Sequence, residues 1–308
     1  MIEIRNLSRR YGSVWALKDV SLRVKEGSVM GLLGQNGAGK TTLLNILTGY
    51  LAPTEGSVLL DGCDPLLDPV AAKRRLGYLP EHPPLYDEMT VKEYLSFVSE
   101  LKGVERRAIP AHVDEVMELT GLADMRRRMV GHLSKGYRQR AGMAQALCGD
   151  PGVLVLDEPT VGLDPKQITE VRALIRTLAK GRTIVFSSHI LTEVQQLCDH
   201  VVILDHGQVR LDASMAEMND PEQITLSCVM AAEEHRVLGR LRELDGVRRV
   251  EFQPGSKAGQ STALISFQHV TEPERRLFAL LASANVPILH LSRCENSLEQ
   301  VFLATISQ

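Results

Sequence analysis

A glycine-rich loop carries the clearest chemistry in this sequence. The run Gly34–Thr41 fits the pattern G-x-x-x-x-G-K-[ST] in full. Glycines let the backbone come close to a phosphate group, so that N–H groups can point at its oxygens. We expect Lys40 to reach the β- and γ-phosphates of a nucleotide, and the Thr41 hydroxyl to bind Mg²⁺. The predicted phosphate-binding residues are Gly34, Asn36, Gly37, Ala38, Gly39, Lys40, Thr41 and Thr42.

Two adjacent carboxylates, Asp157 and Glu158, follow the apolar run Val153–Leu156. A carboxylate that ends a buried strand lies at the edge of the sheet where ligands bind. We expect Asp157 to hold Mg²⁺ through water, and Glu158 to polarise the water molecule that attacks the phosphate. The alternative is a solvated acidic turn before Pro159, which the presence of a phosphate loop makes the weaker interpretation.

The elements that must position these residues alternate between strands and helices. The first ~60 residues are β-rich, and the run Val29 to Leu33 predicts a buried strand before the loop. Lys40 to Thr48 predicts a helix that Gly49 closes, so the loop has the strand–loop–helix context it needs. Further predicted elements are strands at Val153–Leu156, Thr183–Phe186 and Val201–Leu204, and a helix at Gln167–Leu178. This alternation indicates a largely parallel sheet, with the helical stretch at about 85–147 as an inserted lobe.

A change of pattern near Asn219–Pro221 marks a domain boundary. The order that follows is βαββαβ, which is typical of a ferredoxin-like α+β domain. Its predicted elements are Gln223–Met230, Ala232–Leu244, Val247–Phe252, Thr262–Phe267, Glu272–Ala284 and Ile288–Leu291, with a short helix at Ser297–Ala304. This domain also contains a cluster of basic residues. The cluster either binds anionic lipid headgroups or an acidic surface of a partner, or is only a solvated face. The cluster comprises Arg236, Arg240, Arg242, Arg248 and Arg249.

Composition limits the function classes. The 308 residues are 44% hydrophobic and 24% charged, which is ordinary for a globular protein. The net charge of -3 gives no overall attraction to nucleic acid. No run approaches the roughly 18 apolar residues of a membrane span, and the charged start lacks a signal-peptide core. The five widely spaced cysteines predict reduced, structural thiols in the cytoplasm.

Leu133–Tyr137 adds a specific marker to these motifs, since it places a Leu-Ser-x-Gly helix start just before the strand that ends in Asp157. With the motifs in this order, residues 1 to about 215 resemble the ATP-binding subunit of an ABC transporter. The resemblance implies that Ser134 and the backbone N–H of Gly136 contact the γ-phosphate of an ATP held by a partner subunit. The free N–H groups and the dipole of a helix start favour such a contact.

The same resemblance implies roles for three more residues. Tyr11 matches the aromatic residue that stacks on adenine, although a lone Tyr before Gly is more often a turn residue. Asp164, in Gly162–Asp164, matches the loop that faces the partner across the dimer. His189 matches the switch histidine that contacts the γ-phosphate, although a His after a strand is more often structural.

Two departures from the family pattern stand out. Lys135 and Tyr137 replace the commonest Gly and Gln of the signature, but the two residues assigned to phosphate contact are intact. Glu81 stands where most relatives have a Gln that touches Mg²⁺ and the lytic water. A third carboxylate binds Mg²⁺ more strongly than an amide does, and like charges raise one another's pKa. We therefore include Glu81 among the predicted metal-site residues and expect activity to be more sensitive to Mg²⁺.

The predicted fold is α/β, a P-loop NTPase of ABC type over residues 1–218, with a small accessory α+β domain at 219–308. The resemblance implies an ATPase that uses ATP and Mg²⁺, works as a homodimer and energises a permease in a separate chain. Such a subunit would lie on the cytoplasmic face of the cell membrane. The Leu-Pro-Glu around Glu81 and the ending Asn296–Phe302 are similar to ATP subunits of exporters. The alternative is an ABC-type ATPase associated with nucleic acid or the ribosome. Such proteins would carry a long coiled coil or a second ATP-binding head, and the sequence shows neither.

A docking site for the permease is expected between the helical lobe and the sheet, near Glu81 to Met89 and the helix at about 90–100. Leu85, Tyr86 and Met89 either line this groove or pack into the core.

Overall fold

The computed structural model describes residues 1–218, 223–231, 234–254, 260–268, 270–294 and 302. These residues form two compact units, Met1–Met215 and Ala216–Gln308, a division close to the boundary expected after residue 218. No helix in the described ranges is both long enough and apolar enough to cross a membrane. The predicted helix Ser297–Ala304 and the motif Asn296–Phe302 fall largely outside the described residues, as does the side chain of Arg236.

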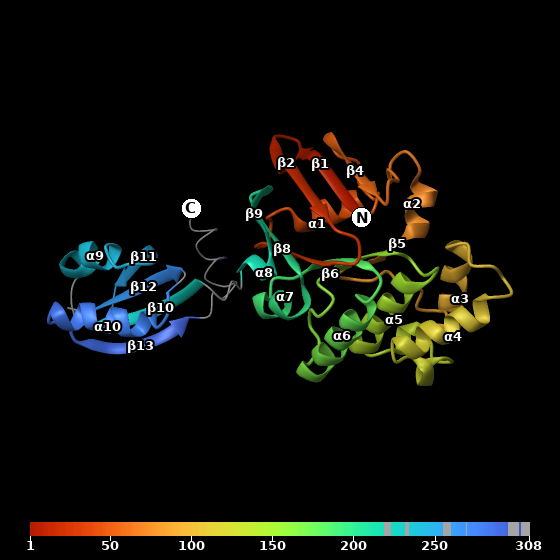
Figure 1. The fold of residues 1–308 in the computed structure, drawn as a ribbon. Helices are drawn as coiled ribbons and strands as arrows, with labels where there is room; N and C mark the ends of the chain where they lie inside the picture. The colour runs from red at the N-terminus through yellow and green to blue at the C-terminus, as the bar shows by residue number, and fades with distance from the viewer. Residues whose placement is uncertain (219–222, 232–233, 255–259, 269, 295–301, 303–308) are drawn as a thin grey trace. The chain divides into compact units, whose positions relative to one another are not determined.

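The first unit contains two sheets (Figure 1). A three-stranded antiparallel sheet has the order β2-β1-β4. A six-stranded sheet has the order β5-β6-β7-β3-β8-β9, in which only β9 is antiparallel to its neighbour. The strands are β1 (Ile2–Tyr11), β2 (Val14–Val24), β3 (Val29–Leu33), β4 (Glu55–Leu60), β5 (Leu76–Leu79), β6 (Val153–Asp157), β7 (Thr183–Ser187), β8 (His200–Asp205) and β9 (Gln208–Ser214). The mixed α/β core predicted from the sequence is confirmed.

Strands β3, β6 and β7 are buried along their whole length. This explains their continuous apolar sequences, because a parallel strand covered on both faces has no polar side. Since β6, β7 and β3 are neighbours and parallel, their carboxyl ends meet at one edge of the sheet. That edge receives the glycine-rich loop after β3, the carboxylates at the end of β6, and His189 after β7.

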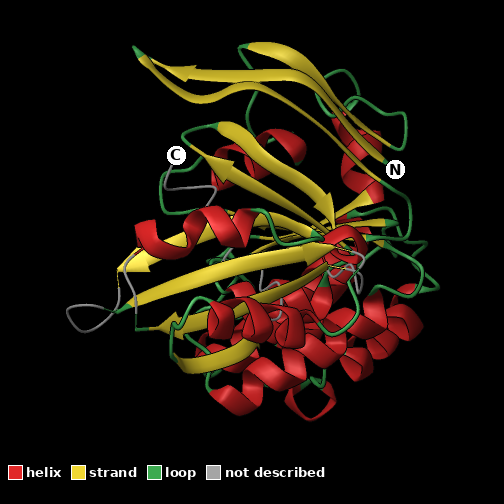
Figure 2. Cartoon of the chain, turned by 60° about the vertical axis from the view of Figure 1, so that its left-hand side comes forward, coloured by secondary structure: helices red, strands yellow, loops and turns green. Residues whose placement is uncertain are grey.

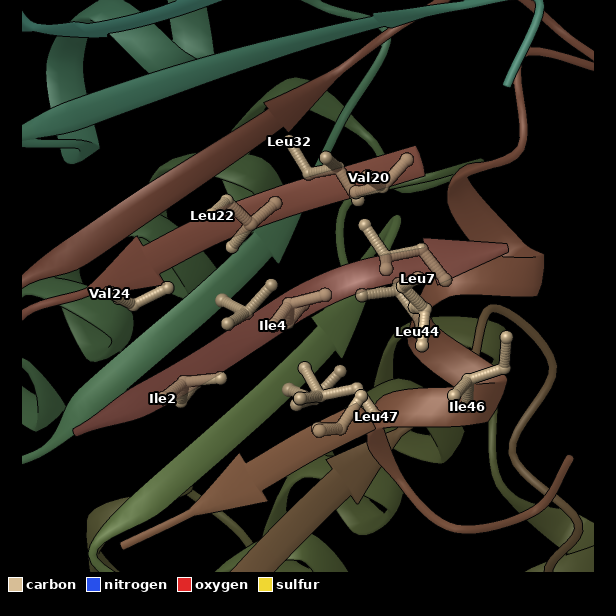
Figure 3. Packing of buried hydrophobic residues seen from close by; sticks show 14 of the residues in the cluster. Ile2, Ile4, Leu7, Val20, Leu22, Val24, Leu32, Leu44, Ile46 and Leu47 are labelled. Atoms are coloured by element: carbon tan, nitrogen blue, oxygen red, sulfur yellow. The ribbon is translucent and has the colours of Figure 1, made fainter. Parts of the chain in front are cut away.

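Helix α1 (Lys40–Leu47) begins at the last residues of the glycine-rich loop and packs into the main core. Its Leu44 and Leu47 lie among side chains of β1 and β2, and both are almost fully buried (Figure 3). Burying a leucine side chain contributes about 1.5–3 kcal/mol, so this contact fixes the helix and therefore the loop before it.

The remaining helices of the first unit include a separate lobe formed by α3, α4 and α5. Thr90 opens α3 with a capping box, in which its hydroxyl accepts from the Glu93 N–H and the Glu93 carboxylate accepts from the Thr90 N–H. The helices are α2 (Pro69–Arg75), α3 (Val91–Leu101), α4 (Ile109–Leu119), α5 (Lys135–Leu147), α6 (Pro165–Leu178) and α7 (Leu191–Leu197), and α8 (Met215–Met218) follows at the boundary between the two units. Helices α3, α4 and α5 fall within the stretch at about 85–147 for which an inserted helical lobe is expected.

The second unit has a four-stranded antiparallel sheet in the order β11-β12-β10-β13, with two helices. Figure 2 shows all strands of the chain in yellow and all helices in red. Its elements are β10 (Gln223–Met230), α9 (Glu234–Arg242), β11 (Val247–Pro254), β12 (Ser261–Gln268), α10 (Pro273–Ser283) and β13 (Ile288–Cys294). Alternate residues of β12 are buried, which is the pattern of a sheet with one face on a core. The βαββαβ order expected from the sequence is the order observed.

The thiols of Cys63, Cys148, Cys198 and Cys228 are free. Burial raises the pKa of Cys148 to about 11, so its thiolate is scarce at neutral pH. This agrees with the structural role expected for the cysteines.

Candidate functional site

The glycine-rich loop joins the end of β3 to the start of α1. Gly37 and Gly39 adopt left-handed backbone conformations, with φ of 83° and 106°. A Cβ on Gly39 would lie 2.6 Å from the carbonyl oxygen of Ala16, so the loop could not pass β2 with a larger residue there. Gly37 is exposed, with open space where its Cβ would be. The loop therefore offers exposed backbone at its tip, as phosphate binding requires.

Lys40 is 7% exposed and points back into the loop. Its ammonium group donates to the carbonyl oxygens of Gly34 at 2.7 Å and Gln35 at 3.4 Å. The cation is thus held within the loop. Thr41 is exposed and Thr42 half-buried in the first turn of α1, beside the N–H groups that the helix start leaves free.

Asp157 is 3% exposed at the end of β6, and it accepts a hydrogen bond of 2.5 Å from the Ser187 hydroxyl on β7. Burial raises the pKa of Asp157; the charges of Glu158 and Glu81 add to the rise, while the Ser187 hydrogen bond and Lys40 oppose it. A buried carboxylate with two acidic neighbours is a favourable place for a cation. The structure therefore brings Glu81, Asp157 and Lys40 into one electrostatic group.

Glu158 has a left-handed backbone, with φ of 47°, which costs energy for any residue other than glycine. Its N–H is held by the Ser187 hydroxyl at 3.0 Å, and its carboxylate meets the Nδ1 atom of His189 at 2.8 Å. The His189 side chain is 55% exposed, whereas that of Glu158 is 11% exposed. The pair thus reaches the surface through the histidine.

Glu81 follows β5 and is exposed. Tyr78, three residues earlier, has a pKa raised to about 12 by burial and by the charge of Asp157. Strand β5 pairs in parallel with β6, the strand that ends in Asp157, and the charge of Glu81 contributes to the raised pKa of Asp157.

The segment Leu133–Tyr137 forms the start of α5. Ser134 is the residue before the first turn; it is exposed, and its side chain makes no capping hydrogen bond. Gly136 is buried, and a Cβ there would lie 2.5 Å from Nε2 of Gln167 on α6. No hydrogen bond or ion pair between described residues connects this segment with the loop at residues 34–42. Ser134 and Gly136 are therefore not joined to the phosphate loop of their own chain.

Asp164 and Tyr11 have local partners. Asp164 caps α6, since its carboxylate accepts from the Gln167 N–H at 2.9 Å, and it remains exposed. Tyr11, at the end of β1, is 47% exposed, and the Arg9 guanidinium lies 4.9 Å from its ring centre. The cation on one side of an exposed ring is compatible with stacking on a planar base.

Sequence reasoning missed Ser187, whose hydroxyl and carbonyl connect Asp157 and Glu158 across two strands. The signal available was a serine at the last position of an otherwise apolar strand that neighbours the carboxylate strand. It also missed Arg9, because the cation and the ring meet only through the local geometry of β1.

The residues fit a Mg²⁺ ion that is shared with phosphate. No group of three or more His, Cys, Asp or Glu in the described part of the chain is arranged to hold a metal by itself. The Thr41 hydroxyl and the Asp157 carboxylate would each offer one oxygen, and Mg²⁺ commonly completes such a set with water and substrate phosphates.

Comparison with known proteins places this site in a family. The family model described as ABC transporter matches residues 17–161. YxlF of Bacillus subtilis, an uncharacterized ABC transporter ATP-binding protein, is 36% identical over 84% of this chain and 85% of its own. BcrA of Bacillus licheniformis, a bacitracin transport ATP-binding protein, is 32% identical over 99% of this chain and 97% of its own. The dimeric ATP-binding cassette MJ0796, bound to ADP and Pi in a post-hydrolysis state, is 25% identical with a TM-score of 0.64, over 70% of this chain and 99% of its own.

Proposed function

Because this chain belongs to the ATP-binding proteins of ABC transporters, we propose that it drives a membrane permease in a separate chain through ATP-dependent closure of a dimer. It is an ATPase, and its ligands are ATP and Mg²⁺. Bound Mg²⁺ neutralises phosphate charge during transfer, and the residues assigned above supply the positioning.

A groove on the first unit supports coupling to a permease. It has a volume of about 410 Å³ and lies between the helical lobe and the core. Its lining is rich in aromatic side chains, including Tyr50, Tyr78, Tyr86, Tyr94 and Phe97. Tyr50 is 84% exposed and Tyr86 49% exposed, which is unusual for such large rings and typical of a protein interface.

Two elements connect this groove with the nucleotide site. Helix α1 begins at Lys40 and ends beside Thr48, which lines the groove. Strand β5 carries Tyr78, also in the lining, and leads directly to Glu81. A helix inserted into the groove would therefore press on elements whose other ends hold the phosphate loop and the carboxylate edge.

The proposed docking residues near residue 85 divide between groove and core. Leu85 is 9% exposed and belongs to the buried hydrophobic residues, whereas Tyr86 lines the groove. Met89 is half-buried and is not part of the lining. Tyr86 is thus the strongest contact candidate of the three.

The dimer proposal is supported by polar groups at the start of α5 that have no partner among the described residues of their own chain. Ser134 is exposed with an unused hydroxyl, and the first turn of α5 has N–H groups that no intrahelical carbonyl accepts. We assign Ser134 and Gly136 to the ATP of the second copy, Asp164 to the surface facing it, and Tyr11 to the adenine. The cassette MJ0796 forms a dimer, which agrees with this arrangement.

For the chemistry, we assign Glu158 as the base that polarises the attacking water, His189 as its partner toward the γ-phosphate, and Lys40 as the cation on the phosphates. General-base catalysis is worth about 10²–10⁴ in rate. Glu158→Gln should therefore abolish most hydrolysis while ATP binding persists, and it should trap the closed dimer on a sizing column. Hydrolysis at the wild-type rate in that variant would remove Glu158 from this role.

We further propose export as the direction of transport and the cytoplasmic face of the membrane as the location. The similarity to BcrA extends over nearly the whole chain and so includes residues 219–308, the proposed accessory domain. A role with nucleic acid or the ribosome is the second candidate, but the net charge of -3 does not favour it.

The groove is tested by Tyr86→Ala with copurification of the permease from native membranes. We expect retention of the permease to fall sharply, while ATP hydrolysis by the isolated subunit stays near the wild-type rate. Phe278→Ala is the matched control, because Phe278 is an aromatic residue of the second unit that is 61% exposed. Full retention of the permease by Tyr86→Ala, Tyr50→Ala and their double variant would exclude the groove as its docking site.

A further inference from the structure

A buried carboxylate lies behind the site and has no role in the assignments above. Glu193, in the first turn of α7, is 0% exposed. One of its oxygens accepts from the Thr160 hydroxyl at 2.9 Å and from the Ser188 hydroxyl at 3.0 Å. The other accepts from the Arg172 guanidinium at 3.1 Å. Both oxygens are therefore paired, as a buried charge requires.

The two hydroxyls belong to the two segments that carry the proposed catalytic pair. Thr160 lies two residues after Glu158, and Ser188 immediately precedes His189. The Ser188 hydroxyl also accepts from the Ile190 N–H at 3.0 Å, which fixes the turn around the histidine. Glu193 thus connects both loops at a single carboxylate oxygen. The same two loops carry Glu158 and His189, whose side chains meet at 2.8 Å.

We propose that Glu193 is a positioning residue that sets the placement of Glu158 relative to His189 by holding Thr160 and Ser188. The proposal rests on the roles assigned to Glu158 and His189 under the proposed function. Arg172 extends the connection to α6, the helix that Asp164 caps, and it also donates to the Gln196 side chain on α7 at 3.2 Å. A shift of the loop at residues 158–164 would therefore reach His189 through Glu193.

The alternative is that this network serves only stability. A buried ion pair is weak evidence for a stabilising role, because desolvation offsets much of its attraction. The geometric evidence is the convergence of hydroxyls from two loops on one atom, since each bond constrains a different segment. The two interpretations differ in whether breaking one hydroxyl contact changes the chemistry or only the unfolding free energy.

Thr160→Val tests this, because valine has nearly the shape of threonine and removes one donor to Glu193. We expect kcat to fall about 10- to 100-fold, the cost of a small misplacement of catalytic groups, with the Kd for ATP within about two-fold of wild type. Ser188→Ala should act in the same way. The ¹⁵N chemical shifts of the His189 ring should move in both variants, because they report the Nδ1 contact with Glu158.

Thr183→Val is the matched control. Thr183 is 1% exposed on β7, and its hydroxyl accepts from the Gly27 N–H at 3.1 Å, far along the strand from the loops. It should lose similar stability with unchanged kcat and an unchanged His189 ring. In a His189→Ala background, Thr160→Val should lower kcat little further, as expected for residues that act as a unit.

The outcomes separate the proposal from its premise. Wild-type kcat and unchanged His189 shifts in both Thr160→Val and Ser188→Ala would overturn the role of Glu193. Wild-type hydrolysis by Glu158→Gln would instead overturn the catalytic assignment, and the His189 shifts would still decide whether Glu193 places the pair.

Discussion

The contact between Gly136 and Gln167 allows a direct test of why the signature needs glycine. A Cβ at position 136 would lie 2.5–2.7 Å from the side-chain amide atoms of Gln167, well inside an ordinary contact. Gln167 is itself placed by the cap of α6, since its side chain accepts from the Asp164 N–H at 3.4 Å. Gly136→Ala must therefore displace Gln167 and disturb the loop that ends at Asp164, while the backbone N–H of residue 136 remains.

The expected magnitude follows from three effects. Overpacking costs about 1–3 kcal/mol, and losing the long hydrogen bond from the Asp164 N–H costs about 0.5–1 kcal/mol. Alanine returns at most about 1 kcal/mol because it is the better helix former. The net loss is about 0.5–4 kcal/mol. In a Gln167→Ala background the clash is gone, so Gly136→Ala should be neutral or stabilising. The coupling between the two sites should therefore be about 1.5–4 kcal/mol, the sum of the overpacking and hydrogen-bond costs.

The assay is urea unfolding of the four proteins in this cycle, followed by the fluorescence of Trp15, the single tryptophan of the chain, which lies in the first unit. ATP hydrolysis is measured in parallel. We expect Gly136→Ala to lose activity and the double variant to regain much of it. A coupling energy near zero, or an activity loss that persists in the double variant, would refute the steric reasoning and leave direct approach of the phosphate as the reason for glycine.

Three further predictions concern β5 and Glu81, which follows it. Glu81→Gln should raise the Mg²⁺ concentration for half-maximal hydrolysis several-fold, and an unchanged Mg²⁺ titration would contradict the assignment of Glu81 to the metal site. The same change removes one of the charges that raise the pKa of Asp157. A carboxyl group whose pKa is raised by folding destabilises the protein at any pH above its pKa in the unfolded chain. Glu81→Gln should therefore raise the Tm of the metal-free protein by about 1–3 °C at pH 7, and this gain should vanish below about pH 4. Gly77→Ala would put a Cβ 2.0 Å from the carbonyl oxygen of Ala146 on α5, so it should cost at least about 1–3 kcal/mol in urea unfolding; a smaller loss would mean that α5 can move away from β5.

The parts of the site that lie close together in sequence were predictable. The strand, loop and helix around Lys40 follow from a pattern that is local, and the strand before Asp157 is marked by its continuous apolar run. The edge where they meet also follows, because neighbouring parallel strands align their carboxyl ends. The βαββαβ order of the second unit came from the same local periodicities.

The contacts that connect distant segments were not predictable. Glu193 has the spacing of an ordinary helix residue, and nothing in its neighbours shows that two hydroxyls and a guanidinium converge on it. Gly136 was assigned to a phosphate through its N–H, but its burial against Gln167 depends on how α5 and α6 pack. Similarly, Leu85 and Tyr86 differ in exposure because of tertiary packing, and two adjacent hydrophobic residues in a sequence do not reveal which of them is buried.

These long-range contacts have a common consequence for coupling. The loop at residues 158–164 is held at one end by Ser187 and Glu193, and at the other by the cap that Asp164 and Gln167 form. Gln167 in turn packs on Gly136 of the signature helix, whose far end at Gln145 and Ala146 lines the groove proposed for docking. The groove, the signature and the proposed catalytic pair are therefore joined within one chain by short, directly packed steps. We therefore expect an event that moves α5 from the groove side to shift Gln167, and through it the loop that carries Glu158, because a close-packed interior leaves little free space to absorb the motion.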